Sequence, residues 1–293
     1  MIIYAKLLLT SFFWGGTFIA GRSLSENVGP FSASFLRFLI ASFFLILFCA
    51  KIEGGFPNIK KKQAPGLILL GLTGIFAYNI FFFKGLKLIE AGRASLIIAN
   101  NPVFITLFSA YLFKEKLNRL KLGGISLSVF GALVVISKGN PIMIFSEGFG
   151  LGEFYIFCCV LSWVSFSLIG KKVLGNLSPL VSITCASIVG SLALLLPALA
   201  EGMVTDVGQY LFPDWVSLFY LGFFGTVIGF VWYYDGIQKI GQTRAGLFIN
   251  FVPVSAIFLA WLILKEPLTI SLLIGAVLVS TGVYLTNSSP STQ

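Results

Sequence analysis

Amide side chains beside prolines are the first groups in this 293-residue sequence that point to ligand chemistry. Asn100 and Asn101 directly precede Pro102, and Asn250 precedes Pro253 by three residues. An amide inside an apolar segment bonds to a neighbouring helix or to a ligand, because a polar group facing hydrocarbon is costly. Both uses, binding a ligand and joining helices, remain open for these three asparagines.

The two prolines lie about nine residues into apolar segments, at matching depths. Each lacks a backbone N–H, so the carbonyl groups of Ile98 and Ile249 lose their usual helical partners. In apolar surroundings these oxygens must be satisfied within the protein. We therefore expect Pro102 and Pro253 to be hinges that turn backbone oxygens toward a binding site. A tolerated packing kink is the alternative.

Aromatic and hydroxyl side chains share a helical face in several apolar segments. Trp14 and Trp163 lie near the middle of their segments, whereas tryptophan in membrane proteins concentrates at the interfaces. Ring faces hold the apolar part of a ligand, while amides and freed carbonyls hold its amino or carboxyl ends. Together with the three asparagines, the predicted substrate-binding residues are Trp14, Thr17, Phe18, Tyr78, Phe82, Trp163, Phe166, Ser167, Trp232 and Tyr233.

Charged and titratable groups are scarce, which excludes several kinds of chemistry. Charged residues make up 11% of the chain, and histidine, the commonest acid-base group at neutral pH, is absent. The four cysteines have no metal-ligand spacing, and no carboxylate lies near the middle of an apolar segment. The sequence therefore predicts no enzyme, no catalytic residue, no metal and no cofactor. A carboxylate proton carrier is also disfavoured.

Arg37 is the exception, about seven residues into an apolar segment. Placing arginine near the bilayer centre costs about 2.5 to 3.5 kcal/mol on insertion scales. Its side chain must therefore face protein or reach the interface. Attraction of an anion and a structural pair are both open for it. The pairs Lys114-Glu115 and Lys265-Glu266, at helix ends, are interpreted as structural or gating latches.

The elements that position these residues are membrane-spanning helices. Hydrophobic residues make up 57% of the chain and its mean hydropathy is +0.96, more than a water-facing surface can hide. We expect an all-α integral membrane protein with ten transmembrane helices. They cover residues 4–24, 31–50, 65–84, 93–113, 121–138, 151–170, 179–199, 215–235, 244–264 and 269–286.

The net charge of +9 is distributed among the short connections between these segments. Lys and Arg are more numerous in the connections on the side of the two termini. The positive-inside rule therefore places both termini in the cytoplasm of a multi-pass plasma membrane protein, in a bacterium the inner membrane. This placement predicts the lipid bilayer as a partner and no nucleic acid.

An internal repeat divides the chain into two five-helix units. Residues 70–137 align with 221–288 at an offset of 151, and upstream an offset of 149 pairs Trp14 with Trp163 and Pro30 with Pro179. We expect units at residues 1–140 and 150–287, followed by a short polar tail at 288–293. Because five is odd, the units insert with opposite orientations, an architecture typical of secondary transporters.

The repeated motifs resemble the EamA-type branch of the drug/metabolite transporter superfamily. The first unit carries Ser11 to Phe18, Gly29-Pro30, Arg37, Ala91 to Ser95, Asn101-Pro102, Lys114-Glu115, and Gly124 with Gly131. The second repeats Gly241 to Ala245, Pro253, Lys265-Glu266, and Gly275 with Gly282. The resemblance implies a central cavity lined mainly by helices 1, 3, 4, 6, 8 and 9. Arg37 departs from the repeat, since Ala186 occupies its counterpart position.

The resemblance and the repeat together predict a secondary transporter that exports or exchanges small organic metabolites by alternating access. Amino acids, including aromatic and apolar ones, fit the predicted rings and amides. An antiporter or importer of nucleotide-type or other anionic metabolites is the alternative, although it calls for several central cations. A membrane-embedded enzyme is disfavoured. The expected oligomeric state is a monomer or a homodimer that uses glycine-rich helix faces.

Overall fold

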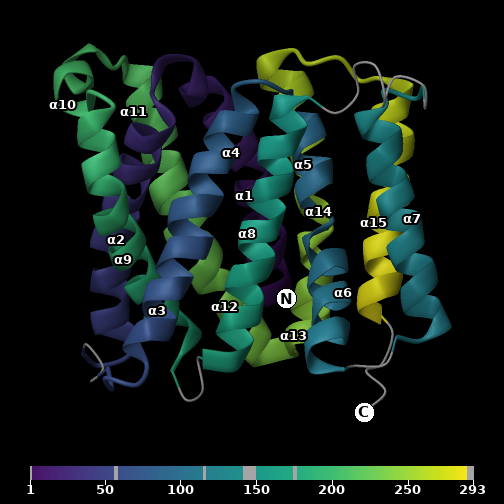
Figure 1. Cartoon of the computed structure of the whole chain (residues 1–293), viewed down its shortest axis with the longest axis horizontal. Coiled ribbons are helices and arrows are strands. Elements are labelled where there is room, and N and C mark those ends of the chain that lie inside the picture. The colour runs from purple at the N-terminus through teal and green to yellow at the C-terminus, as the bar shows by residue number, and fades with distance from the viewer. Residues whose placement is uncertain (1, 56–58, 115–116, 141–149, 174–176, 289–293) are drawn as a thin grey trace.

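The computed structural model describes residues 2–55, 59–114, 117–140, 150–173 and 177–288. Within these ranges the chain is helical, has no strand, and holds ten helices long and apolar enough to cross a membrane. The expected all-helical fold with ten spans is confirmed. Figure 1 shows the helices packed side by side, with the N-terminus in the lower half of the bundle and the C-terminus at its lower end.

The first five spans are continuous helices or helices interrupted in the middle. Spans 1, 2 and 5 are α1 (Ile2–Asn27), α2 (Pro30–Ile52) and α7 (Arg119–Ile136). Span 3 consists of α3 (Ala64–Leu70), the π-helical η1 (Gly71–Ala77) and α4 (Tyr78–Leu86). Span 4 consists of α5 (Ala91–Ile98) and α6 (Asn101–Phe113).

The second five spans repeat this division. Spans 6, 7 and 10 are α8 (Leu151–Val173), α9 (Pro179–Ala200) and α15 (Ile270–Ser288). Span 8 consists of α11 (Phe212–Phe219), the π-helical η4 (Tyr220–Ile228) and α12 (Gly229–Ile240). Span 9 consists of α13 (Gln242–Ile249), α14 (Phe251–Leu259) and η5 (Ala260–Leu264). Two short helices, α10 (Met203–Asp206) and η3 (Val207–Gln209), connect spans 7 and 8.

Local sequence explains where several of these helices begin and end. Pro30 and Pro179 each occupy the first position of a helix, where the missing N–H costs nothing. Lys114 and Lys265 each end a helix in the left-handed conformation, with φ of 56° and 59°. The two prolines occupy equivalent positions in the repeat, and so do the two lysines. Corresponding helices of the two units therefore begin or end in the same way.

The π-helical segments give spans 3 and 8 matching contacts with other helices. A Cβ added at Gly71 in η1 would lie 2.9 Å from the Ala186 carbonyl oxygen, and one at Gly222 in η4 would lie 2.8 Å from the Arg37 carbonyl oxygen. Gly71 and Gly222 are repeat counterparts, and so are Ala186 and Arg37. Each glycine thus lets a helix of the other unit approach closely, an arrangement consistent with the expected inverted repeats.

Glycines also join span 5 to span 10. A Cβ at Gly124 would lie 2.7 Å from the Gly282 carbonyl oxygen, and one at Gly282 would lie 2.6 Å from that of Gly124. Helices α7 and α15 accordingly run side by side at one lateral side of the bundle, and α2 and α9 lie at the other (Figure 1). These glycines pack within the chain, and the expected monomer or homodimer stays a prediction.

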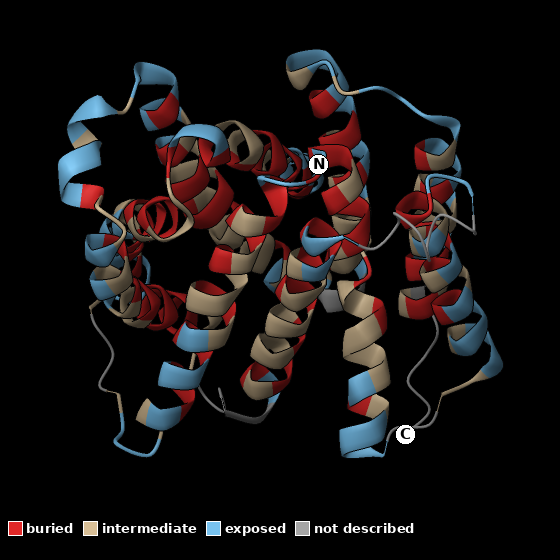
Figure 2. Cartoon of the chain, turned by 45° about the horizontal axis from the view of Figure 1, so that its top comes forward, coloured by how far each residue is buried: buried red, intermediate tan, exposed pale blue. Residues whose placement is uncertain are grey.

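Packing is uneven along spans 4 and 9. In α5, six of the eight residues are buried, whereas α6 buries only Val103 and Ser109. In span 9, α14 buries four residues, while Ala245 is the buried one among the α13 residues whose burial is described. Both α6 and α13 lie toward the lower end of the bundle in Figure 1, here called the termini end. Figure 2 shows buried residues gathered inside the bundle and exposed residues at many helix ends. The opposite end is called the distal end. In span 4 the distal half, α5, is the more buried one, whereas in span 9 most of the buried residues lie in α14, and η5 at the distal end buries only Ala260.

Candidate functional site

Six aromatic rings from spans 1, 3, 6 and 8 meet inside the bundle. This aromatic cluster consists of Trp14, Tyr78, Trp163, Phe166, Phe230 and Tyr233. Ring centroids lie 5.3 Å apart for Trp14 and Tyr233, 5.7 Å for Trp14 and Phe230, and 6.3 Å for Phe230 and Trp163. Trp163 also lies 5.3 Å from Tyr78 and 5.0 Å from Phe166. All six side chains are half-buried.

Five of these six residues belong to the predicted binding set, and Phe230 does not. Phe230 lies between the two tryptophan rings and so connects spans 1, 6 and 8. The chain contains 31 phenylalanines, so residue type gave no reason to select this one. Its spacing of three residues before Tyr233 was the available signal, because such residues share a helical face.

The backbone of the π-helical segments holds two of the rings in place. The indole Nε1 of Trp14 donates to the Gly225 carbonyl of η4 over 2.9 Å, and the Thr17 hydroxyl donates to the Trp14 carbonyl over 2.6 Å. The ring of Phe166 packs directly over Gly74 of η1. Segments η1 and η4 therefore form part of the support of the aromatic cluster, as π-bulges often do at functional sites.

Phe18 and Phe82 lie behind this cluster. They are 4% and 2% exposed, and their ring centroids are 5.4 Å apart. Phe82 also stacks on Tyr78, with centroids 6.0 Å apart. In this structure Phe82 packs on Tyr78 and Phe18 packs on Phe82, and the direct contact of either ring with a ligand stays a prediction.

Ser167 and Trp232 take up other positions. The Ser167 hydroxyl donates to the Trp163 carbonyl over 2.8 Å, a bond within its own helix. Trp232 packs on Phe13, with centroids 5.9 Å apart, and the Lys6 ammonium lies 6.0 Å from its ring. Neighbouring Tyr233, by contrast, contacts Trp14. The structure thus separates two adjacent aromatic residues that the sequence grouped together.

The asparagines beside the prolines differ in their hydrogen bonding. Asn100 donates to the Leu96 carbonyl over 2.9 Å and accepts from the Ser128 hydroxyl of α7 over 2.8 Å, so it joins spans 4 and 5. The Oδ1 atom of Asn101 is buried and has no hydrogen-bond partner among the described residues. Asn250 is half-buried between α13 and α14. Of the two uses expected for these amides, Asn100 takes the interhelical one.

Both spans that contain these asparagines are interrupted just before their prolines. The α-helical conformation stops between Ile98 and Asn101, and again at Asn250. The breaks lie where Pro102 and Pro253 cannot supply a backbone N–H. A hinge motion at these points stays a prediction.

Arg37 lies deep in the bundle between spans 3 and 8. Its Nη1 donates to Asn79 Oδ1 over 2.9 Å and its Nη2 donates to Thr226 Oγ1 over 3.3 Å. Asn79 in turn donates to the Ile75 carbonyl of η1, and Thr226 belongs to η4. The guanidinium carbon lies 5.2 Å from the centre of the Phe38 ring. The structure therefore gives Arg37 neutral partners in spans 3 and 8.

Carboxylates tie helix ends together at the distal end. Glu266, in the connection between spans 9 and 10, accepts from the backbone N–H groups of Ala91 and Gly92 over 2.7 and 3.0 Å. Arg93 pairs with Glu153 over 2.9 Å. Glu266 thus caps α5 and links the second unit to the first, and the latch role of the Lys265-Glu266 pair stays a prediction. Its repeat counterpart, Glu115, lies outside the described residues.

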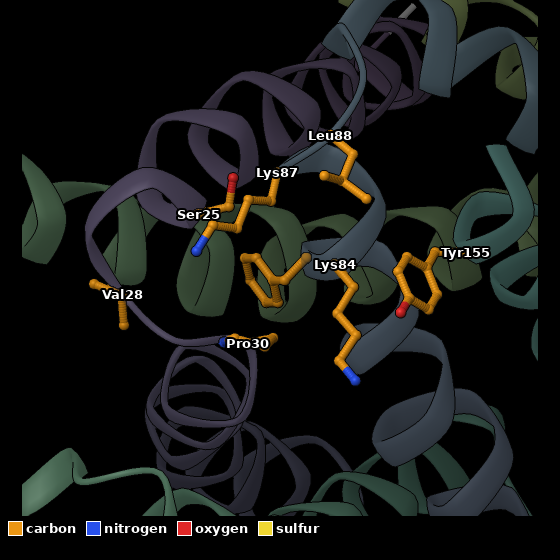
Figure 3. Close-up of a pocket in the computed structure, with 8 residues that line it drawn as sticks. Ser25, Val28, Pro30, Lys84, Lys87, Leu88 and Tyr155 are labelled. Carbon is orange, nitrogen blue, oxygen red and sulfur yellow. The ribbon is translucent and has the colours of Figure 1, made fainter. Parts of the chain in front are cut away.

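A separate pocket of about 190 Å³ opens at the distal end. Figure 3 shows Lys84 beside Tyr155, with Lys87 near Ser25 on the other side. The Lys84 ammonium lies 5.6 Å from the ring centres of both Phe31 and Tyr155. This pocket does not include any residue of the aromatic cluster.

Ten apolar spans around polar and aromatic groups are the arrangement of a multi-pass membrane transport protein. The chain belongs to the EamA-like transporter family, whose model matches residues 1–137 and 150–288. The resemblance seen in its motifs is thereby confirmed, and so is a transporter function of this family's type. Proteins of this family are named as transporters, not enzymes.

Similar proteins span nearly the same length. The chain is 30% identical over 289 residues to the uncharacterized transporter YetK of Bacillus subtilis, covering 97% of this chain and 86% of that protein. It is 27% identical over 290 residues to a probable amino-acid metabolite efflux pump of Escherichia coli, covering 95% and 92%. A crystal structure with a TM-score of 0.68 and 20% identity covers 98% of this chain and 99% of that one, and it has the same fold.

Proposed function

We propose that this protein is a secondary transporter that exports or exchanges amino acids or closely related small metabolites, with aromatic or apolar side chains preferred. The aromatic cluster carries the proposal, because half-buried rings from four spans offer an apolar surface inside the bundle. Asn101 adds an amide oxygen without a protein partner among the described residues. The relative named as a probable amino-acid metabolite efflux pump supports the same substrate class.

Alternating access is the proposed mechanism. The distal end is capped and paired through Glu266 and the Arg93–Glu153 bridge, whereas α6 buries few of its residues. The links at the distal end suit a conformation closed there, and at the termini end the Lys6–Asp235 pair joins α1 to α12. We propose that the protein lies in the bacterial inner membrane with both termini on the cytoplasmic side, following the distribution of basic residues. The breaks before Pro102 and Pro253 are the proposed hinges.

Counterflow in liposomes tests this function. Purified protein is reconstituted and assayed with radiolabelled phenylalanine, leucine, glutamate and a nucleotide, with and without unlabelled solute inside. We expect saturable uptake of phenylalanine and leucine that internal solute stimulates. Uptake restricted to the nucleotide would contradict the proposed substrate class and favour an anionic-metabolite antiporter.

Two substitutions test the site in the same assay. Trp163→Ala removes the ring contacts with Tyr78 and Phe166, and Asn101→Ala removes the amide oxygen that has no partner among the described residues. A ring contact contributes about 1 kcal/mol, so flux at low substrate concentration should fall about fivefold. Phe43→Ala is the matched control, since Phe43 is 59% exposed and outside the aromatic cluster. Flux unchanged by both test substitutions would remove these residues from the site.

A further inference from the structure

Arg37 is a buried cation without a countercharge in the described part of the chain. Its residue is 8% exposed, and no Asp or Glu oxygen of the described residues forms an ion pair with it. Asn79 and Thr226, which accept its two hydrogen bonds, are neutral. Hydrogen bonds to neutral groups lower the cost of burial but leave the net charge in place.

The guanidinium also has unused donor capacity. It carries five N–H groups in a planar fork that matches a carboxylate. The Nε atom is buried and has no hydrogen-bond partner among the described residues. The bond from Nη2 to Thr226 is 3.3 Å, at the long end of the normal range. An anion could therefore gain two parallel hydrogen bonds from this fork.

Its partners connect the guanidinium to the aromatic cluster. Asn79 directly follows Tyr78, whose ring lies 5.3 Å from that of Trp163. Thr226 directly follows Gly225, whose carbonyl accepts from the Trp14 indole. One partner of the cation thus adjoins a residue of the cluster in sequence, and the other adjoins a residue that binds one.

We infer that the Arg37 guanidinium binds a carboxylate of the transported molecule, while the aromatic cluster holds its apolar side chain. This inference rests on the proposed function and narrows its substrate class to solutes with one carboxylate beside an apolar group. A bound carboxylate compensates the positive charge of Arg37. It also accepts hydrogen bonds from N–H groups that otherwise donate to the neutral oxygens of Asn79 and Thr226. Ala186 stands at the repeat counterpart of Arg37, so the second unit does not repeat this arginine.

Binding at this position also connects the cargo to the contact between spans 2 and 8. Arg37 in α2 bonds to Thr226 in η4, and its carbonyl oxygen packs against Gly222 of the same segment. A carboxylate that draws Nη2 away weakens this link between the two units. The cargo therefore loosens spans 2 and 8 relative to one another when it occupies the site.

Competition between matched ligands tests the inference. Wild-type protein in liposomes transports labelled phenylalanine or leucine against unlabelled phenylalanine, phenylalanine methyl ester and phenethylamine. The ester and the amine keep the ring and lack the carboxylate. We expect phenylalanine to compete about 10- to 100-fold better, the usual range for a charge-assisted hydrogen bond. Equal competition by all three compounds would overturn the inference.

Arg37→Met and Arg37→Lys separate binding from a structural role. If Arg37 binds the carboxylate, Arg37→Met should abolish the preference for phenylalanine over phenethylamine, and Arg37→Lys should retain part of it. Thr226→Val removes one neutral partner without changing charge, and the preference should persist. If Arg37 only joins helices, flux of every solute falls together and the preference is unchanged in each variant that folds, which overturns the inference.

The outcomes distinguish this inference from the proposed function. Wild-type flux that Trp163→Ala reduces, with equal competition by acid, ester and amine, leaves the transporter proposal standing and rejects the carboxylate site. Absence of amino-acid and amine flux in the wild type rejects the substrate class itself. Should Arg37→Met fail to fold, the wild-type ligand series still decides the matter.

Discussion

Two neighbouring asparagines with the same chemistry have different surroundings. Asn100 bonds to Leu96 in its own span and to Ser128 in the next one, and Asn101 Oδ1 has no partner in the described structure. An amide whose groups are all engaged stabilises the fold. An amide with a free buried acceptor is available to a ligand that donates a hydrogen bond, such as an ammonium group.

Substitution of Asn100 should therefore reduce stability, whereas substitution of Asn101 should reduce flux. Asn100→Leu leaves the Ser128 hydroxyl without its acceptor and should lower the free energy of unfolding by about 1 to 3 kcal/mol. Asn101→Leu removes no protein hydrogen bond of Oδ1 and should leave stability within about 0.5 kcal/mol while reducing amino-acid flux. Thermal unfolding in detergent, paired with counterflow, measures both effects.

Ser128→Ala is the control for this pair, because it removes the same hydrogen bond from α7. It should destabilise the protein in the direction of Asn100→Leu and leave flux per folded molecule unchanged. Equal losses of stability at Asn100 and Asn101 would contradict the assignment of separate roles.

At the scale of elements, sequence reasoning located the helix breaks but missed the π-helical segments. Pro102 and Pro253 indicate breaks because each lacks an N–H, and the helices stop just before them. The segments η1 and η4 arise from a shift in hydrogen-bond pattern that depends on packing against other spans. Gly74 illustrates this dependence, because its missing side chain admits the Phe166 ring from span 6.

The contact between η1 and α8 makes a prediction that a double substitution can test. Gly74→Ala places a methyl group against the Phe166 ring and should displace it from Trp163, reducing flux several-fold and stability by about 1 to 3 kcal/mol. Phe166→Ala opens the space, so the double variant should lose less stability than the sum of the two single losses. Differential scanning fluorimetry of the four proteins gives the coupling energy.

Gly123→Ala serves as the comparison for the glycine substitution, since a Cβ there meets nothing within 4 Å. It should be neutral or slightly stabilising because alanine favours the helix. Additive effects of Gly74→Ala and Phe166→Ala would show that the two residues do not share the packing described.

At the scale of the whole molecule, hydropathy and the repeat predicted the ten spans, because lipid demands long apolar helices. They did not predict which residues of these spans meet. Phe230 enters the aromatic cluster while Trp232 packs beside Phe13, although both types are aromatic. Similarly, Arg37 was recognisable as a costly charge, but its position between spans 3 and 8 follows from tertiary packing. Residue type therefore indicates which residues could join the site. The rotation of each helix about its axis decides which of them face it.

The contact between Glu266 and the start of α5 joins the two five-helix units at the distal end. Glu266 of the second unit accepts hydrogen bonds from the N–H groups of Ala91 and Gly92, which begin α5 in the first unit. A carboxylate at a helix N-terminus is stabilised by these donors and by the helix dipole. In an alternating-access cycle this bond must break when the distal end opens, so its strength sets part of the population of the closed form.

Glu266→Gln should therefore raise the population open at the distal end. Loss of the charge costs about 1 kcal/mol, which corresponds to about a fivefold rise in amide hydrogen exchange across residues 91–98 of α5. Hydrogen–deuterium exchange in nanodiscs measures the change directly. Glu26→Gln is the matched control, because Glu26 is an exposed carboxylate near the same end of the bundle. Exchange in α5 that stays at the wild-type rate in Glu266→Gln would mean that the carboxylate does not hold the distal end closed.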